Sequence, residues 1–273
     1  MKFWRVQDLN NLECLHASKI AEFLPRHSHE EYVIGVMLRG AEKVIRRATT
    51  HILTAGDLIL LNPGELHSND STDKGSKYRT LNPHPEFVRK VLFEITGREQ
   101  NAPVFPEIVR DKENFGSILR LHLALERSHS TLEQESIFIS TLELLIARHA
   151  LASFTLPQIG RERAYVKLVR DYLDAHYTEN VSLSQLGSLV NLSHYHLLRN
   201  FRDEVSLPPH EYQNQLRIAH AKQLLRAGLP IAQVALEVGY VDQSHLSRHF
   251  KRLVGLTPGQ YSPNSKNIQD KIL

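Results

Sequence analysis

The stretch IAQVALEVGYVDQSHLSRHFKRLVGLTPGQY, residues 231–261, decides the fold of this chain because an earlier stretch repeats its pattern. The earlier copy is LSQLGSLVNLSHYHLLRNFRDEVSLPPHEY, residues 183–212. Gln185 aligns with Gln233 at an offset of 48 and, after one inserted residue in the turn, Phe201 aligns with Phe250 at an offset of 49. A short helix, a tight turn and a capped second helix, present twice, are typical of helix-turn-helix units. The sequence therefore predicts two such units, at 183–205 and 231–254.

Capping residues support these boundaries. Ser182 with Gln185 forms a capping box, and Ser193 and Asp242 are good N-caps for the second helix of each unit. Between the units, residues 209–226 predict one helix of 18 residues. At about 1.5 Å per residue it is about 27 Å long. Such a spacer can hold two recognition helices roughly one DNA turn apart, about 34 Å.

The second helix of each unit has two different faces. Leu197 and Phe201 in the first unit, and Leu246, Phe250 and Leu253 in the second, recur at core spacing and are expected to point inward. The opposite, exposed face is expected to carry His194, Tyr195, Leu198, Arg199 and Arg202 in the first unit, and Gln243, Ser244, Ser247, Arg248 and Lys251 in the second. Gln, Ser and Arg side chains in the exposed N-terminal half of such a helix can hydrogen-bond base edges in a major groove. The side chains best placed for phosphates, which position a protein without specifying sequence, are Arg202, Lys251 and Arg252. A helical protein–protein module with solvated arginines is the alternative.

Residues 164–262 resemble the DNA-binding domain of AraC/XylS-type transcriptional regulators, with 231–262 the more specific copy. The resemblance implies double-stranded DNA as a partner. It also implies a set of base-reading residues: Tyr195, Leu198, Arg199, Gln243, Ser244 and Arg248. Leu198 departs from the family, because this position is often polar there. A leucine contacts a thymine methyl group but does not distinguish donors from acceptors.

Before residue 110 the pattern is that of short strands. Runs such as YVIGVML (32–38) and DLILL (57–61) are separated by glycines and by Pro63-Gly64, which favours an antiparallel sandwich or small barrel. Helical spacing follows at 113–128, and Thr131 with Gln134 predicts a capping box that starts a helix reaching about residue 153. These helices either cover the sheet or form a seam with a second copy. The predicted class is α+β, with a domain at 1–155, a linker at 156–163 and an all-α domain at 164–273.

The stretch PRHSHEEY (25–32) places two histidines in the strand region, and LTAGDLILLNPGELHSND (53–70) adds a third. Both stretches resemble the half-motifs of a cupin-like sensor domain, which family members often carry. The predicted effector-binding residues are His27, His29, Tyr32, Arg46, His67 and Tyr78. A divalent metal held by His27, His29 and His67 is an alternative. In metal-binding cupins, however, the glutamate lies several residues beyond the second histidine, whereas Glu30 and Glu31 follow His29 immediately.

Composition narrows the function classes. The single cysteine, Cys14, excludes an intrachain disulfide framework, and the N-terminus lacks the apolar run of a signal peptide. From Arg161 onward 14 Lys and Arg stand against 10 Asp and Glu, a net of +4 in a chain of net +3. We therefore expect a cytoplasmic, non-enzymatic, homodimeric regulator without a cofactor or membrane association, whose partners are DNA, a small-molecule effector and RNA polymerase. A metal-dependent cupin enzyme fused to a DNA-binding domain and a ligand-independent regulator are the alternatives.

Overall fold

The computed structural model describes residues 1–19, 23–46, 49–106, 109–150 and 163–262. The chain folds into two compact units. Unit 1 comprises residues 1–127 and 137–159, and unit 2 comprises residues 128–136 and 160–273. None of the described helices is both long and apolar enough to cross a membrane.

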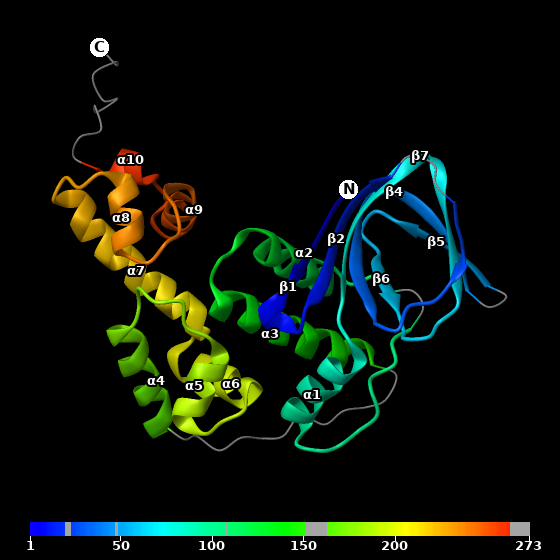
Figure 1. The fold of residues 1–273 in the computed structure, drawn as a ribbon, viewed down its shortest axis with the longest axis horizontal. Helices are drawn as coiled ribbons and strands as arrows, with labels where there is room; N and C mark the ends of the chain where they lie inside the picture. The colour runs from blue at the N-terminus through cyan, green and yellow to red at the C-terminus, as the bar shows by residue number, and fades with distance from the viewer. Residues whose placement is uncertain (20–22, 47–48, 107–108, 151–162, 263–273) are drawn as a thin grey trace, which may run out of the picture. The chain divides into compact units, whose positions relative to one another are not determined.

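Unit 1 is built on an antiparallel sheet, as the sequence predicts (Figure 1). Its strands are β1 (Lys2–Val6), β2 (Leu12–Lys19), β3 (Phe23–His27), β4 (Val33–Arg46), β5 (Thr49–Thr54), β6 (Leu58–Leu61) and β7 (His67–Asn82). The long strands β4 and β7 pair with each other, and each also pairs with two shorter strands, one after the other, along its second edge. The first part of β4 pairs with β6 and its second part with β5, while β7 pairs first with β3 and then with β2. Strands are confirmed within 32–38 and 57–61, but the break expected at Gly40 is wrong, because β4 runs through it for 14 residues, and the 16-residue strand β7 was not predicted.

One face of this sheet carries both a hydrophobic core and the histidines. The core side chains on it include Val33, Met37, Val44, Leu53, Ile59, Leu61 and Tyr78. Val44 pairs with Asn69, and two residues further on Arg46 pairs with His67. Paired residues share a face and alternate residues return to it, so Arg46 and His67 lie on the core side. His27 pairs with His67 and joins them there.

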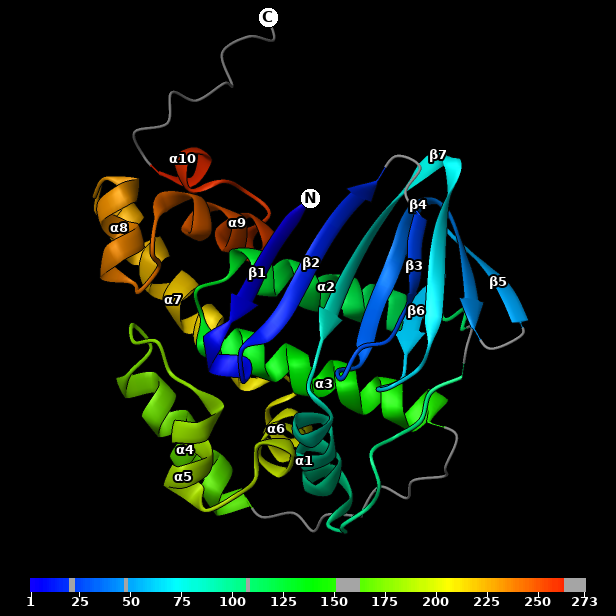
Figure 2. The same cartoon turned by 45° about the vertical axis from the view of Figure 1, so that its right-hand side comes forward.

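Three helices follow the strands: α1 (Pro85–Thr96), α2 (Lys112–Arg127) and α3 (Thr131–His149). Helix α2 packs against β4 and β7, so it covers the sheet (Figure 2). The Trp4 indole donates to the Leu125 carbonyl (3.2 Å), and the His122 ring lies 3.0 and 3.1 Å from the carbonyl oxygens of Leu15 and Thr80. His122 is thus a buried polar link between helix and sheet, where helical spacing alone suggested an apolar stripe.

The start of α3 differs from prediction by one residue. The Ser130 hydroxyl, not that of Thr131, accepts from the backbone N–H of Glu133 (3.2 Å), so the expected capping box at Thr131 and Gln134 is wrong. The Gln134 amide instead donates to the Ser128 carbonyl (2.8 Å). Helix α3 ends at His149, before the predicted end at about residue 153, whereas the predicted linker at 156–162 lies outside the described residues. Helix α1 was not predicted.

Unit 2 is helical, as predicted. Its helices are α4 (Arg163–Ala175), α5 (Leu183–Val190), α6 (His194–Val205), α7 (Pro209–Arg226), α8 (Ile231–Glu237), α9 (Gln243–Val254) and α10 (Pro258–Tyr261). The helix boundaries expected for both helix-turn-helix units and for the spacer helix are confirmed. A buried apolar cluster joins α7, α8 and α9 and includes Ile218, Leu225, Val234, Leu246 and Phe250.

Candidate nucleic-acid interface and ligand site

The turn between α8 and α9 is fixed by its neighbours. Gly239 adopts φ +84°, and a Cβ built there would lie 2.2 Å from the Thr178 carbonyl oxygen, so only glycine fits. After the turn, the Asp242 side chain accepts from the His245 backbone N–H (2.7 Å) and caps α9. The orientation of α9 on the rest of unit 2 is therefore set by backbone packing and by the cap that the sequence predicted.

Helix α9 presents a polar face to solvent. Gln243, Ser244 and Arg248 lie on this face, as do Lys251 and Arg252 toward the C-terminal end. On the other face Leu246 and Phe250 are fully buried in the core of unit 2. Leu253, expected to point inward, is 41 % exposed, because it lies in the last turn of the helix. The predicted division of α9 into two faces is correct apart from this end.

Helix α6 departs from prediction at two positions. Tyr195 and Leu198 are 1 % and 6 % exposed, so the exposed position expected of both is wrong. Leu198 follows Leu197 directly and lies three residues before Phe201. The apolar arc of a helix is at least about 100° wide and takes in such neighbours as well as the i, i+4 positions. Arg199 is half-buried and donates to the Tyr195 hydroxyl (3.3 Å), whereas Arg202 is exposed.

The three histidines predicted from two separate stretches meet in unit 1. The ring centroids of His27 and His67 are 4.3 Å apart, and those of His29 lie 5.0 and 5.2 Å from them. One ring nitrogen of each lies within 4.8 Å of the other two. Strand pairing places His27 opposite His67 at the end of β3, and the chain beyond β3 brings His29 back. The structure thus brings these three residues together in one cluster.

Two of these histidines are held in the neutral form. Burial, the largest cause, and the neighbouring His27 lower the pKa of His29. Burial also lowers the pKa of His67, aided by His27, His29 and Arg46 and opposed by the Glu65 carbonyl. That carbonyl lies 2.9 Å from Nδ1 of His67, so Nε2 is the nitrogen available to a ligand. Neutral imidazoles can hydrogen-bond a polar ligand or coordinate a cation.

The other predicted effector residues are used differently. Arg46 is buried beside His67, where its guanidinium donates to the Leu60 carbonyl (2.7 Å) and lies 3.5 Å from Glu65. Tyr78 is buried in the core on the same face. Tyr32, however, donates its hydroxyl to the Pro103 carbonyl (2.6 Å) and packs edge-on against Phe105. The prediction that Tyr32 joins the histidines is therefore not supported by its contacts.

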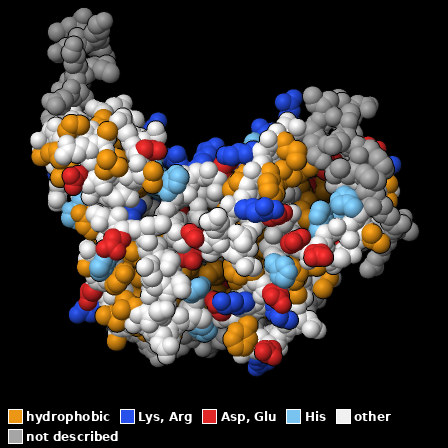
Figure 3. All heavy atoms as spheres, in the orientation of Figure 1, with side chains coloured by type: hydrophobic (Ala, Val, Ile, Leu, Met, Phe, Trp, Pro, Cys, Tyr) orange, Lys and Arg blue, Asp and Glu red, His pale blue; other side chains and the backbone are white. Residues whose placement is uncertain are grey.

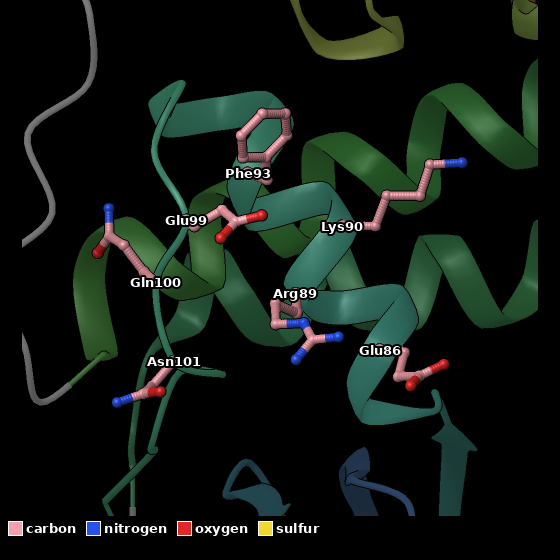
Figure 4. Close-up of a pocket in the computed structure, with 7 residues that line it drawn as sticks. All are labelled: Glu86, Arg89, Lys90, Phe93, Glu99, Gln100 and Asn101. Carbon is pink, nitrogen blue, oxygen red and sulfur yellow. The ribbon is translucent and has the colours of Figure 1, made fainter.

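A separate hollow lies on unit 1, lined by residues other than the histidines. It has a volume of about 700 Å³ and opens to solvent (Figure 4). The lining side chains come from α1 and the segment after it: Glu86, Arg89, Lys90, Phe93, Glu99, Gln100 and Asn101. Acidic and basic groups are mixed there, as they are over the face of the molecule in Figure 3. A hollow of mixed charge does not select a ligand of either sign.

A second cluster, in unit 2, was missed by sequence reasoning. Glu133, His245 and His249 are all buried and offer ligand atoms within 4.8 Å of one another. The available signal was the spacing of the two histidines, four residues apart on the recognition helix, which places both on one face. Their partner Glu133 is distant in sequence and carried no signal.

Comparisons with known proteins agree with this division. A family model described as an AraC-like ligand binding domain matches residues 9–142, and a helix-turn-helix domain model matches residues 186–264. The chain is similar to the uncharacterized HTH-type transcriptional regulator YbfI of Bacillus subtilis (strain 168), 35 % identical over 238 residues, which cover 86 % of each chain. It is 26 % identical over 246 residues to the arabinose operon regulatory protein of Escherichia coli (strain K12), covering 84 % of this chain and 80 % of that one. Among solved structures, ToxT from Vibrio cholerae O395 matches with 15 % identity and a TM-score of 0.36, covering 92 % and 95 % of the two chains.

Proposed function

Because the chain belongs to the AraC family of DNA-binding transcription regulators, with an N-terminal ligand-binding domain, we propose how it carries out that role. A homodimer in the cytoplasm binds operator DNA through both helix-turn-helix units and acts on RNA polymerase. A small polar effector bound in unit 1 controls this activity. The relatives are transcriptional regulators, and we propose no reaction for the histidines of unit 1.

The DNA-binding proposal rests on the polar face of α9. Gln243, Ser244 and Arg248 occupy its N-terminal half, and an arginine there can bond to O6 and N7 of guanine. Lys251 and Arg252 follow about one turn later, where they contact phosphates. In α6 we assign base contact to Arg199 and phosphate contact to Arg202. The buried Tyr195 and Leu198 then support the helix rather than touch bases.

The effector proposal rests on the convergence of three imidazoles on the core side of the sheet. Two of them have a lowered pKa and are neutral: His29 has one donor and one acceptor nitrogen, whereas His67, whose Nδ1 donates to the Glu65 carbonyl, offers Nε2 as an acceptor, which suits a small ligand with hydroxyl groups. His67 is aimed by the Glu65 carbonyl, so its Nε2 is preoriented. The Arg46 guanidinium is already bonded to the Leu60 carbonyl and lies beside Glu65. We therefore assign it the role of positioning His67 and Glu65 rather than of contacting the ligand.

One observation favours a second candidate for the same cluster. A histidine whose far nitrogen is bonded to a backbone carbonyl is the usual form of a metal ligand, and His67 has that arrangement. The donor set of three imidazoles fits zinc or another divalent transition ion. In that case His27, His29 and His67 hold the ion, and the effector site lies elsewhere.

Two experiments test the proposal. DNA bound by the full chain is selected from a random library, with and without candidate ligands, and should yield two half-sites about one helical turn apart. Thermal unfolding of the wild type and of His67→Gln is then measured with small polar ligands and with Zn²⁺. A ligand that raises the wild-type Tm and alters operator affinity, but does neither in His67→Gln, supports an effector site. Stabilisation by zinc that is present in the wild type and lost in His67→Gln supports a metal at the histidines of unit 1.

A further inference from the structure

The second cluster, Glu133, His245 and His249, lies inside unit 2. His245 and His249 stand four residues apart in α9 and are buried. Glu133 comes from the first turn of α3, within the segment 128–136 that belongs to unit 2. Each offers one ligand atom, and these atoms lie within 4.8 Å of one another.

The position of Glu133 is fixed by hydrogen bonds within the unit. The Thr131 backbone N–H donates to the Asn180 side chain (2.9 Å), and the Leu183 backbone N–H donates to the Glu135 carboxylate (2.6 Å). The Ser128 hydroxyl donates to Oε2 of Glu133 itself (2.6 Å). The carboxylate is therefore held in place beside α9 rather than swinging freely.

Three of the four imidazole nitrogens in this cluster are buried without a hydrogen-bond partner in the part of the chain that the structure describes. His245 and His249 are 4 % and 6 % exposed. Both ring nitrogens of His245 and Nδ1 of His249 are inaccessible and have no hydrogen-bond partner among the described residues. A buried polar group left unsatisfied costs about 1–3 kcal/mol, and an ion that bonds one nitrogen of each ring would remove part of this cost.

We propose that Glu133, His245 and His249 bind one divalent transition ion of the zinc type. Two imidazole nitrogens and a carboxylate oxygen are a donor set that zinc accepts, and an imidazole pair at i, i+4 on a helix is a recurrent half of such sites. Nitrogen donors disfavour Mg²⁺ and Ca²⁺, which take oxygen ligands. Ligand atoms around a tetrahedral zinc are about 3.4 Å apart at bonds of about 2.0–2.1 Å, so the 4.8 Å cluster closes by small side-chain rotations.

The basic side chains around the cluster oppose a cation: in addition to burial, Arg217 and Arg248 lower the pKa of both histidines, and Arg252 lowers that of His249, so the Glu133 carboxylate has to offset them. Burial, the largest cause, lowers the pKa of His245 to about 4 and that of His249 to about 3, so both rings are unprotonated ligands at neutral pH. Arg217 is a buried cation close to the cluster, and its guanidinium is bonded to the carbonyl oxygens of Tyr177 (2.6 Å) and Glu179 (2.8 Å). It also lies over the Tyr240 ring, 5.4 Å from the centroid, and is thus engaged by groups other than the three ligands. A bound ion would cross-link α9 to residues 128–136.

Zinc uptake by the full chain tests this site directly. The parent carries His27→Gln and His67→Gln, which removes the histidine cluster of unit 1 as a second binder. After chelator treatment it is titrated with Zn²⁺, and bound metal is measured after gel filtration. We expect about one zinc per chain, and Kd raised more than about 100-fold by Glu133→Gln or His249→Gln, since even loss of an outer-shell partner costs about 10–100-fold. His220→Gln, in the same unit but outside the cluster, should leave Kd unchanged.

Co²⁺ provides a readout that needs no substitution in the cluster. Bound to the parent, it should give the intense visible bands of a four- or five-coordinate ion. A weak six-coordinate spectrum, no zinc uptake at micromolar concentration, or uptake that survives both substitutions would each overturn the proposal. The readout is the metal itself, so the result is independent of whether the proposed DNA and effector contacts are correct.

Discussion

Replacing Gly239 with alanine should destabilise unit 2 far more than the same change at Gly228. The two glycines have nearly the same conformation, φ +84° and +85°. Each substitution therefore carries the same cost of about 1–2 kcal/mol for a side chain in the left-handed region. The new Cβ at position 228 meets nothing within 4 Å. At position 239 it lies 2.2 Å from the oxygen and 2.7 Å from the Cα of Thr178, which are backbone atoms that cannot rotate away.

The clash adds a cost of the overpacking kind, about 1–3 kcal/mol, because the α8–α9 turn must move away from Thr178. Added to the conformational cost, it gives an expected loss of about 2–5 kcal/mol for Gly239→Ala against about 1–2 kcal/mol for Gly228→Ala. Urea unfolding of the full chain is followed by circular dichroism for the helices and by fluorescence of the single tryptophan, Trp4, for unit 1. Only the dichroism transition should shift. Equal destabilisation by the two substitutions would refute the packing of this turn on Thr178.

Three further outcomes follow from the described contacts. The pKa of His122 is about 4 in the fold against an ordinary 6.5, so its contribution to stability is complete above pH 6.5 and is lost as the pH falls toward 4. At about 1.36 kcal/mol per pKa unit, the free energy of unfolding falls by about 3 kcal/mol over this range. Measured by Trp4 fluorescence, the free energy of unfolding of His122→Gln should not show this fall. Asp242→Ala should cost about 1 kcal/mol through the lost cap of α9, whereas Asp242→Asn, which keeps an acceptor, should cost little; urea midpoints distinguish them. In the zinc titration, Kd should stay nearly constant from neutral pH down to about pH 5 and rise only as the pH approaches 4, where protons begin to compete for His245 and His249; a Kd that rises steeply between pH 7 and pH 6 would contradict these two ligands.

Local signals explain why unit 2 could be predicted closely. Its helices begin at residues whose side chains cap them, such as Ser182, Ser193 and Asp242, and the predicted capping bonds are present. The repeat adds a second, independent copy of the same pattern. The prediction failed at Tyr195 and Leu198 of α6. The helical spacing of Leu197 and Phe201 identified the centre of the buried face of this helix, but it did not show how wide that face is.

Unit 1 was less predictable because its decisive contacts are long-range. The strand β7 contains Asp70, Lys77 and Arg79 among its residues and shows no clear alternation, so its pairing with β4 and β2 has no local signature. The convergence of His27 and His67 was predictable from the cupin-like motifs, whereas the hydrogen bond from the Tyr32 hydroxyl to Pro103 was not. Glu133 meets α9 only through tertiary packing, so no spacing in the sequence pointed to it.

The most direct test of DNA recognition by α9 compares Arg248→Ala with Lys251→Ala. The affinity of each full-length variant is measured for the selected operator and for a scrambled duplex over a range of salt concentrations. If Arg248 reads a base, its loss costs about 1–3 kcal/mol on the operator and little on the scrambled site, while loss of Lys251 weakens both alike and reduces the salt slope by about one. Parallel losses on both duplexes for Arg248→Ala would contradict the assignment of α9 as the base-reading helix.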